Sequence, residues 1–143
     1  MLHRLVFALF ATCLLSALLR AAETKASPPP AAPDSDTAMY YVCVLTKGLY
    51  EGVGMKEERK KTQAAENAYI NQLAREGKLL ATGPIVDNSD WRGIYVFKCA
   101  TLAEAKALAN ADPEVKAGRL KVEIHAWMTE KGSVRDPALA PPK

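Results

Sequence analysis

Residues 59–90 have the sequence RKKTQAAENAYINQLAREGKLLATGPIVDNSD, which predicts a helix, a strand and a turn in close succession. At 100° per residue the inner stripe of the helix collects Met55, Arg59, Thr62, Glu66, Tyr69, Ile70 and Leu73. The opposite stripe is polar and contains Lys60, Lys61, Asn67, Asn71 and Arg75. Gly77 is placed to end the helix, and residues 78–86 then form a strand that enters a turn at residues 87–90.

Glu66 is the most informative residue of this helix because it places a carboxyl group in the middle of the inner face. A buried carboxylate needs a partner, a raised pKa or a water-filled cavity. Two interpretations follow. Glu66 is either a general acid or base, or a structural residue neutralised by Arg59, which lies two helical turns earlier on the same stripe.

The flanking segments complete the fold. Further strands are expected at residues 39–46, 93–98 and 120–128, and a second helix begins at the capping box Thr101 to Glu104. The loop at residues 47–54 contains three glycines and can border a ligand site. The order strand, helix, strand, strand, helix, strand predicts an α+β fold of ferredoxin-like type, a four-stranded antiparallel sheet with both helices on one face.

One face of such a sheet has no helix to cover it. Alternation along the first strand places one of two sets on that face, either Tyr41, Cys43 and Leu45 or Tyr40, Val42 and Val44. An uncovered apolar face is commonly buried against a second copy, so we expect a homodimer.

The termini are expected to lie outside the domain. Residues 1–22 have the layout of a cleavable signal peptide, with Arg4 before an apolar run and alanines at its end, which favours export to the periplasm or the medium over a retained membrane anchor. Residues 23–38 are rich in Pro, Ala and Ser and predict a disordered tether. The domain is expected at residues 39–131 and a disordered tail at residues 132–143.

Charge and residue composition restrict the kinds of molecule that this protein is expected to bind. The net charge of +3 falls to +1 when Arg4 and Arg20 leave with the signal, so there is no electrostatic case for nucleic acid or, after cleavage, for the membrane. Cys43 and Cys99 remain, and packed thiols are favoured over a disulfide. Gly-rich phosphate loops, nucleophile elbows and metal-ligand spacings are missing from the sequence, so we expect neither a cofactor nor a metal.

Five segments in order resemble the YCII-related domain family. They are residues 66–70 (ENAYI), 76–84 (EGKLLATGP), 92–97 (RGIYVF), 111–118 (ADPEVKAG) and 122–127 (VEIHAW). The resemblance spans nearly all of residues 39–128 and implies a ferredoxin-like dimeric α/β barrel. It also implies a catalytic pair made by a histidine on the first helix and the aspartate of the Asp-Pro motif. Asp112 matches that aspartate, whereas the histidine position is occupied by Glu66.

The candidate catalytic residues are therefore Glu66 and Asp112. An ordinary glutamate is fully ionised at neutral pH, whereas a histidine exchanges protons there, so the replacement bears directly on activity. Asp112 also has a structural interpretation, because aspartate followed by proline is a common helix N-terminus.

Four further residues are candidates for binding a ligand: His125, Arg59, Tyr41 and Arg92. His125 lies on the polar side of the last strand, with a structural role as the alternative. Tyr41 could line a pocket, although aromatic residues in small sheets usually serve packing.

The functional expectation is acid–base chemistry on a small polar molecule, in a pocket of the dimeric barrel between helix and sheet. The alternative is a non-catalytic module that binds a small molecule or supports assembly and has lost the family histidine.

Export predicts that the mature protein lacks residues 1–22 or a slightly longer segment. Mass spectrometry of the N-terminus checks this, and protein recovered from the cytoplasm with its N-terminus intact would contradict it.

Overall fold

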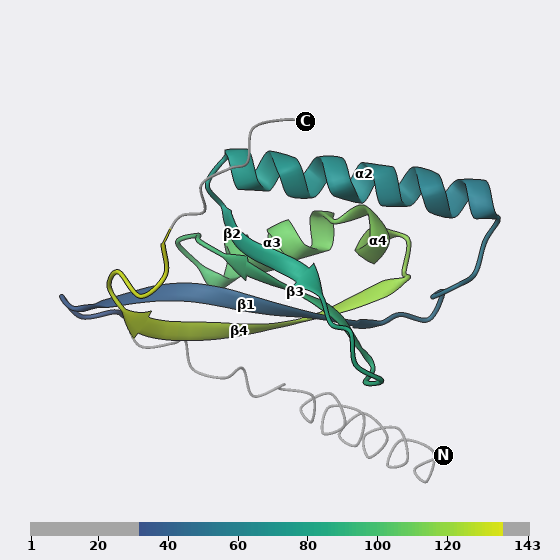
Figure 1. The fold of residues 1–143 in the computed structure, drawn as a ribbon. Coiled ribbons are helices and arrows are strands. Elements are labelled where there is room, and N and C mark those ends of the chain that lie inside the picture. The colour runs from purple at the N-terminus through teal and green to yellow at the C-terminus, as the bar shows by residue number, and fades with distance from the viewer. Residues whose placement is uncertain (1–31, 136–143) are drawn as a thin grey trace, which may run out of the picture. The chain divides into compact units, whose positions relative to one another are not determined.

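The computed structural model describes residues 32–135, which form a sheet with helices on one of its faces (Figure 1). The elements in order are β1 (Thr37–Lys47), α2 (Lys56–Arg75), β2 (Leu79–Pro84), β3 (Trp91–Phe97), α3 (Leu102–Ala111), α4 (Pro113–Lys116) and β4 (Leu120–Glu130). The sheet is antiparallel throughout with the order β2-β3-β1-β4. The predicted ferredoxin-like fold class is confirmed, as is a short second helix, α3, followed by one further turn, α4, that opens at Asp112-Pro113.

The predicted signal peptide at residues 1–22 lies outside the described residues, as do most of the predicted tether and tail. Within residues 32–135, no helix combines the length and the apolar character needed to cross a bilayer.

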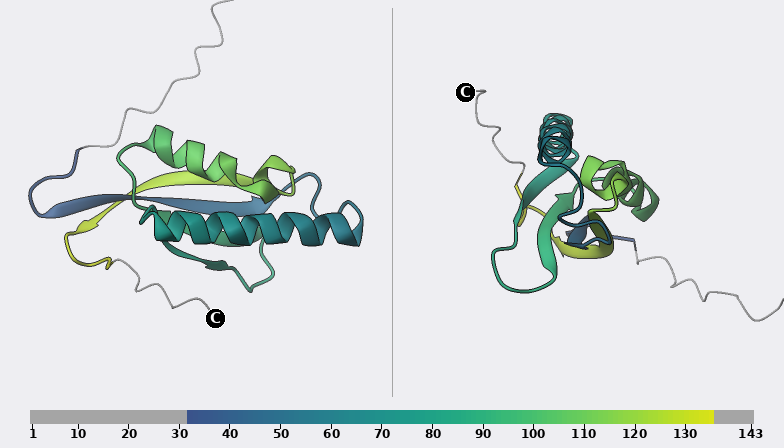
Figure 2. Two further views of the ribbon diagram at one scale, coloured as in Figure 1. Left: turned by 90° about the horizontal axis from the view of Figure 1, so that it is seen from above. Right: turned by 90° about the vertical axis from the view of Figure 1, so that its right-hand side faces the viewer.

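α2 ends as its sequence predicts. Gly77 has a φ of +68°, a conformation that glycine adopts without strain. Its N–H donates to the carbonyl of Ala74, and the N–H of Lys78 donates to the carbonyl of Leu73 at 2.9 Å. The chain therefore turns sharply enough for β2 to return beneath the helix (Figure 2).

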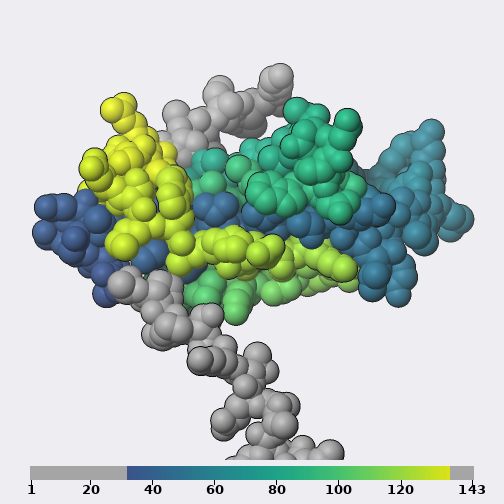
Figure 3. Space-filling model, turned by 90° about the horizontal axis from the view of Figure 1, so that it is seen from below, coloured from purple at the N-terminus to yellow at the C-terminus, as the bar shows by residue number. Residues whose placement is uncertain are grey.

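The core lies between the helices and the sheet. Tyr41, Cys43 and Leu45 of β1 face the helices and belong to one buried cluster with Leu73 of α2 and Ala105 of α3. Since side chains alternate along a strand, Tyr40, Val42 and Val44 lie on the other face. Of the two residue sets that the sequence left open, the second therefore lies on the sheet face without helices. On this face β4 lies beside β1 (Figure 3).

Both helix starts near the Asp-Pro motif are capped by side chains. Thr101 Oγ1 accepts the N–H of Glu104 at 3.1 Å, which is one half of the predicted capping box, whereas the Glu104 carboxylate accepts the N–H of Ala100, one residue before the cap. Asp112 Oδ1 accepts the N–H groups of Glu114 at 2.7 Å and Val115 at 3.3 Å, with Pro113 at the first helical position.

Cys43 and Cys99 are free thiols, as expected from the sequence. Burial raises the pKa of Cys43 to about 12 and that of Cys99 to about 11. Because the thiolate is the reactive form, both are poor nucleophiles at neutral pH.

Gly48 lies so close to the chain after α4 that adding one methyl group there should destabilise the fold. A Cβ at Gly48 would lie 2.4 Å from the backbone of Arg119, where the N–H of Gly48 now donates to the Arg119 carbonyl at 2.8 Å. We expect Gly48→Ala to lower the free energy of unfolding by about 2 kcal/mol, the usual cost of overpacking.

Chemical denaturation measures this effect. Gly83→Ala is the control, because a Cβ at Gly83 meets no atom within 4 Å, and it should stay within about 0.5 kcal/mol of the unmodified protein. Equal stability of the two variants would contradict the close approach.

Candidate active site

A cleft of about 750 Å³ opens between α2, the ends of β2 and β3, and the residues that follow α4. Its acidic centre is Glu66, with Gln63 from the same helix and Tyr95 from β3 beside it. Arg59, Arg92 and Arg119 also line it. With Glu51 and Glu114, which also line the cleft, three glutamates and three arginines surround a ligand that enters this space.

Glu66 lies inside, as its place on the helix stripe predicts. The residue is 9% exposed, and its Oε2 accepts a hydrogen bond from Gln63 Nε2 at 2.6 Å. Burial raises the pKa of Glu66 to about 7, with the charges of Asp112 and Glu114 adding to the shift and the bonds from Tyr95 and Gln63 opposing it. Glu66 thus exchanges a proton in the neutral range.

Tyr95 joins Glu66 to Asp112. The Tyr95 hydroxyl is 2.5 Å from Asp112 Oδ2, to which it donates, and its oxygen lies 3.4 Å from Glu66 Oε1. Burial, followed by the hydrogen bond and charge of Asp112, raises the pKa of Tyr95 far above its ordinary value, so the phenol stays neutral. Because the hydroxyl has one proton and Asp112 Oδ2 is the closer acceptor, the contact of Tyr95 with Glu66 Oε1 is the weaker of its two hydrogen bonds.

Asp112 is fully buried and does not line the cleft. Its carboxylate accepts three hydrogen bonds, two from the first turn of α4 and one from Tyr95. A ligand in the cleft cannot touch it. The structure therefore does not bring Asp112 to the cleft with Glu66, and its link to the cleft runs through Tyr95 and through its charge on Glu66.

The interpretation that Arg59 neutralises Glu66 is wrong. Arg59 Nη1 donates to the carbonyl of Gly52 at 2.8 Å and to that of Gly54 at 3.4 Å, in the loop before α2. Side chains on a helix lean toward its N-terminus, so Arg59 reaches away from Glu66 although both share a stripe. Arg59 still lines the cleft, as a ligand-binding role requires.

Arg92 also lines the cleft, where it forms a two-pronged ion pair with Glu51 of the β1–α2 loop. The guanidinium lowers the pKa of Glu51 below its ordinary value. This pair ties the loop to β3. Arg119 makes a similar contact with Glu114, Nε to Oε2 at 2.7 Å, on the wall beside α4.

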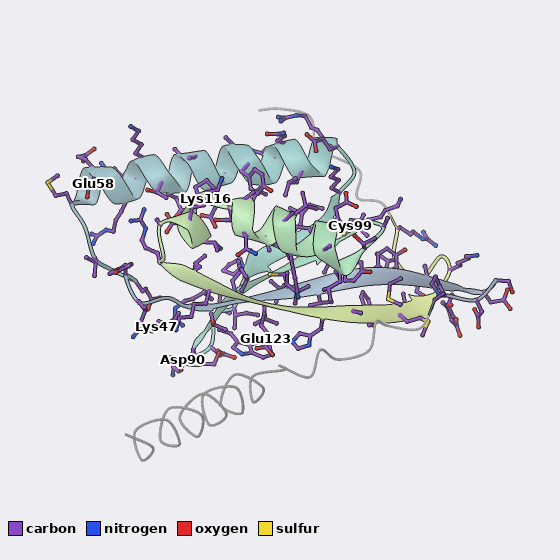
Figure 4. All side chains as sticks on the ribbon, turned by 180° about the vertical axis from the view of Figure 1, so that it is seen from behind. Lys47, Glu58, Asp90, Cys99, Lys116 and Glu123 are labelled. Atoms are coloured by element: carbon purple, nitrogen blue, oxygen red, sulfur yellow. The ribbon has the colours of Figure 1, made fainter. Side chains whose placement is uncertain are left out.

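His125 and Tyr41 are not brought to the cleft. His125 lies on the helix-free face, where its Nε2 is 3.1 Å from Glu123, and Glu123 points away from the helices in Figure 4. The strand register explains this, because His125 is paired with Val42 of the same face. Tyr41 is 4% exposed and packed in the core cluster.

Tyr95, Gln63 and Arg119 were not singled out from the sequence. Tyr95 had a usable signal: it is the hydroxyl-bearing member of the alternating set Gly93, Tyr95 and Phe97, which faces the core. Gln63 lies one turn before Glu66, a spacing that brings side chains together. For Arg119, the residue pattern carried no such signal.

The chemistry available at the cleft is proton exchange by one carboxyl group. In the part of the chain that the structure describes, no group of three or more His, Cys, Asp or Glu side chains is placed to hold a metal ion.

No curated protein sequence matches the chain. Among solved structures, a 5-chloro-2-hydroxyhydroquinone dehydrochlorinase from Burkholderia phenoliruptrix, in complex with 2,5-dihydroxybenzoquinone, is 20% identical and has a TM-score of 0.46, with 62% of this chain and 92% of that chain covered. A likeness of this size carries no argument about activity.

The family model described as YCII-related domain matches residues 39–128, well over half of the chain. The resemblance found in the five sequence segments is thereby confirmed, and the chain belongs to the YCII-related domain family.

Proposed function

We propose that this protein performs acid–base chemistry on a small polar molecule bound in the cleft, with Glu66 as the group that gives and takes the proton. The observation that carries the proposal is a cleft with the buried carboxyl group of Glu66 on its wall, and the pKa of this group is raised to about 7. A general acid or base is most effective when its pKa is close to the working pH.

The Tyr95–Asp112 pair supports Glu66 in two ways. The negative charge of Asp112 raises the pKa of Glu66, which keeps a useful fraction of the acid protonated. The Tyr95 oxygen, held by Asp112, fixes the position of Oε1, while Gln63 fixes Oε2. A carboxyl group held by both oxygens keeps one orientation toward a bound molecule.

The second candidate is a binding module without turnover. It is favoured by the replacement of the family histidine at position 66, because a site that has lost its original proton carrier can still hold a ligand. The two candidates differ in one respect: only the enzyme requires that Glu66 ionises during its cycle.

The raised pKa of Glu66 predicts a defined pH dependence of stability. The folded protein binds the Glu66 proton more tightly than the unfolded chain, so stability is highest below about pH 4.5 for this group and falls as the pH rises toward 7. Glu66→Gln removes this ionisation. As the pH rises from about 4.5 to about 7, the free energy of unfolding of the variant should therefore increase by up to about 3 kcal/mol relative to that of the unmodified protein.

Denaturation at several pH values and carbon NMR of the Glu66 carboxyl both measure the shift. Asp112→Asn should lower the pKa of Glu66, since asparagine also caps helices but carries no charge. Glu57→Gln is the matched control, because Glu57 is an exposed residue on the same helix whose carboxylate pairs with Lys60. An ordinary Glu66 pKa near 4.5 would remove the basis of the proposal.

Turnover separates the two candidates. In a screen of small hydroxylated and carbonyl compounds, the enzyme interpretation expects product formation that depends on pH near 7 and is lost in Glu66→Gln but not in Glu57→Gln. Ligand binding without turnover in any sample, together with unchanged affinity in Glu66→Gln, supports the binding module instead.

We further propose that the helix-free face of the sheet pairs with a second copy of this chain. The face carries Tyr40, Val42 and Val44 along β1 and is flanked on β4 by Lys121 and Glu123. Since both charge signs occur on one face, a two-fold arrangement can bring Lys121 of one copy to Glu123 of the other. The dimeric architecture implied by the family resemblance supports the same pairing.

If two copies pair through this face, sedimentation analysis should show a dimer at micromolar concentration. Val42→Asp should convert it to a folded monomer, because a charge would be buried at the centre of the contact. Val86→Asp, at a site that is 92% exposed, serves as control and should remain dimeric. A monomeric unmodified protein would refute the proposal.

A further inference from the structure

We propose that the molecule bound in the cleft carries a carboxylate, and that Arg59 binds this carboxylate while the reacting end lies at Glu66. The inference deepens the proposed function, on which it rests, by naming the chemical class of the ligand. It depends on which of the three arginines that line the cleft are already paired with a carboxylate of the protein.

Two of these arginines already have carboxylate partners. Arg92 is paired with Glu51 and Arg119 with Glu114, and the latter pair is largely shielded from solvent. A ligand would have to displace a protein carboxylate to bind either of them. Arg59, by contrast, contacts only backbone carbonyls within residues 32–135.

The contacts of Arg59 leave one edge of its guanidinium for a ligand. Both carbonyl bonds, to Gly52 and Gly54, use Nη1. Nε and Nη2, whose N–H groups point the same way, have no acceptor among the residues that the structure describes. This edge matches the two oxygens of a carboxylate and permits a bidentate contact. The loop carbonyls therefore hold the guanidinium in place and lower the entropic cost of binding.

The spacing of Arg59 and Glu66 limits the size of the ligand. Seven residues separate them, which corresponds to about 10 Å along the helix axis, and both side chains lean in the same direction. A small aromatic or unsaturated acid can place its carboxylate at Arg59 and its far end near Glu66. A single inorganic ion cannot reach both.

The surrounding charges favour an anion. Three arginines and three glutamates line the cleft, so protonation of Glu66 leaves an excess of one positive charge among them. A shallower hollow of about 400 Å³ shares Arg59 with the main cleft and is also lined by Lys56 and Lys60. Lys60 has Glu57 as a partner, yet the approach to Arg59 is on balance basic, which raises the local concentration of anions.

Matched pairs of acids and amides test the inference. Benzoate with benzamide, and fumarate with fumaramide, differ in charge but hardly in shape, and their dissociation constants can be measured by NMR titration of the full mature chain. We expect the acid of at least one pair to bind about tenfold more tightly than its amide. Arg59→Gln should abolish this preference and Arg59→Lys should retain part of it. Arg75→Gln, the control on the last turn of the same helix, should leave it unchanged.

The result is separable from that of the proposed function. Glu66→Gln keeps Arg59 intact and should preserve the preference for acids, whatever happens to turnover. A normal Glu66 pKa together with an Arg59-dependent preference would reject the acid–base proposal and retain the carboxylate site. Equal binding of acid and amide, no binding of either pair at millimolar concentration, or a preference that survives Arg59→Gln would overturn the inference.

Discussion

The buried carboxylate of Asp112 is the constraint on which this structure depends. It has no access to water, and its charge is compensated by three hydrogen bonds, two from the first turn of α4 and one from Tyr95. The same group therefore fixes where α4 begins, how Tyr95 is oriented and how readily Glu66 ionises. Helix start, strand side chain and acid form one connected arrangement that depends on a single residue.

Much of this arrangement is predictable from local patterns. The helix period, the glycine at its end and the capping boxes give the order of elements, and they place Glu66 inside and Asp112 at a helix start. Local patterns do not show in which direction a side chain extends or on which sheet face it lies. Arg59 shares the stripe of Glu66 but extends toward the N-terminus of the helix and so away from Glu66, and His125 lies on a face that only the strand pairing determines. The contact of Tyr95 with Asp112 joins β3 to the start of α4, so the sequence of neither segment alone reveals it.

The glutamate at position 66 occupies the place where the family resemblance implies a histidine. With its pKa raised to about 7, it exchanges protons in the same pH range as an imidazole, but each of its two states carries one less positive charge. The replacement therefore need not remove proton exchange; it changes the charge at which the exchange takes place. A neutral acid and a carboxylate replace a cation and a neutral ring, and the nearby arginines then become the main positive groups of the cleft.

The loop between β1 and α2 is attached to the cleft by residues that take no part in proton exchange. Arg59 and Arg92 hold its backbone and its Glu51, while Leu49 and Val53 project into solvent and contribute little to the core. In the proposed function, selectivity and reactivity thus belong to separate parts of the chain. The sequence of the loop can change, and with it the compounds that the cleft accepts, without rebuilding the acid or the sheet that supports it.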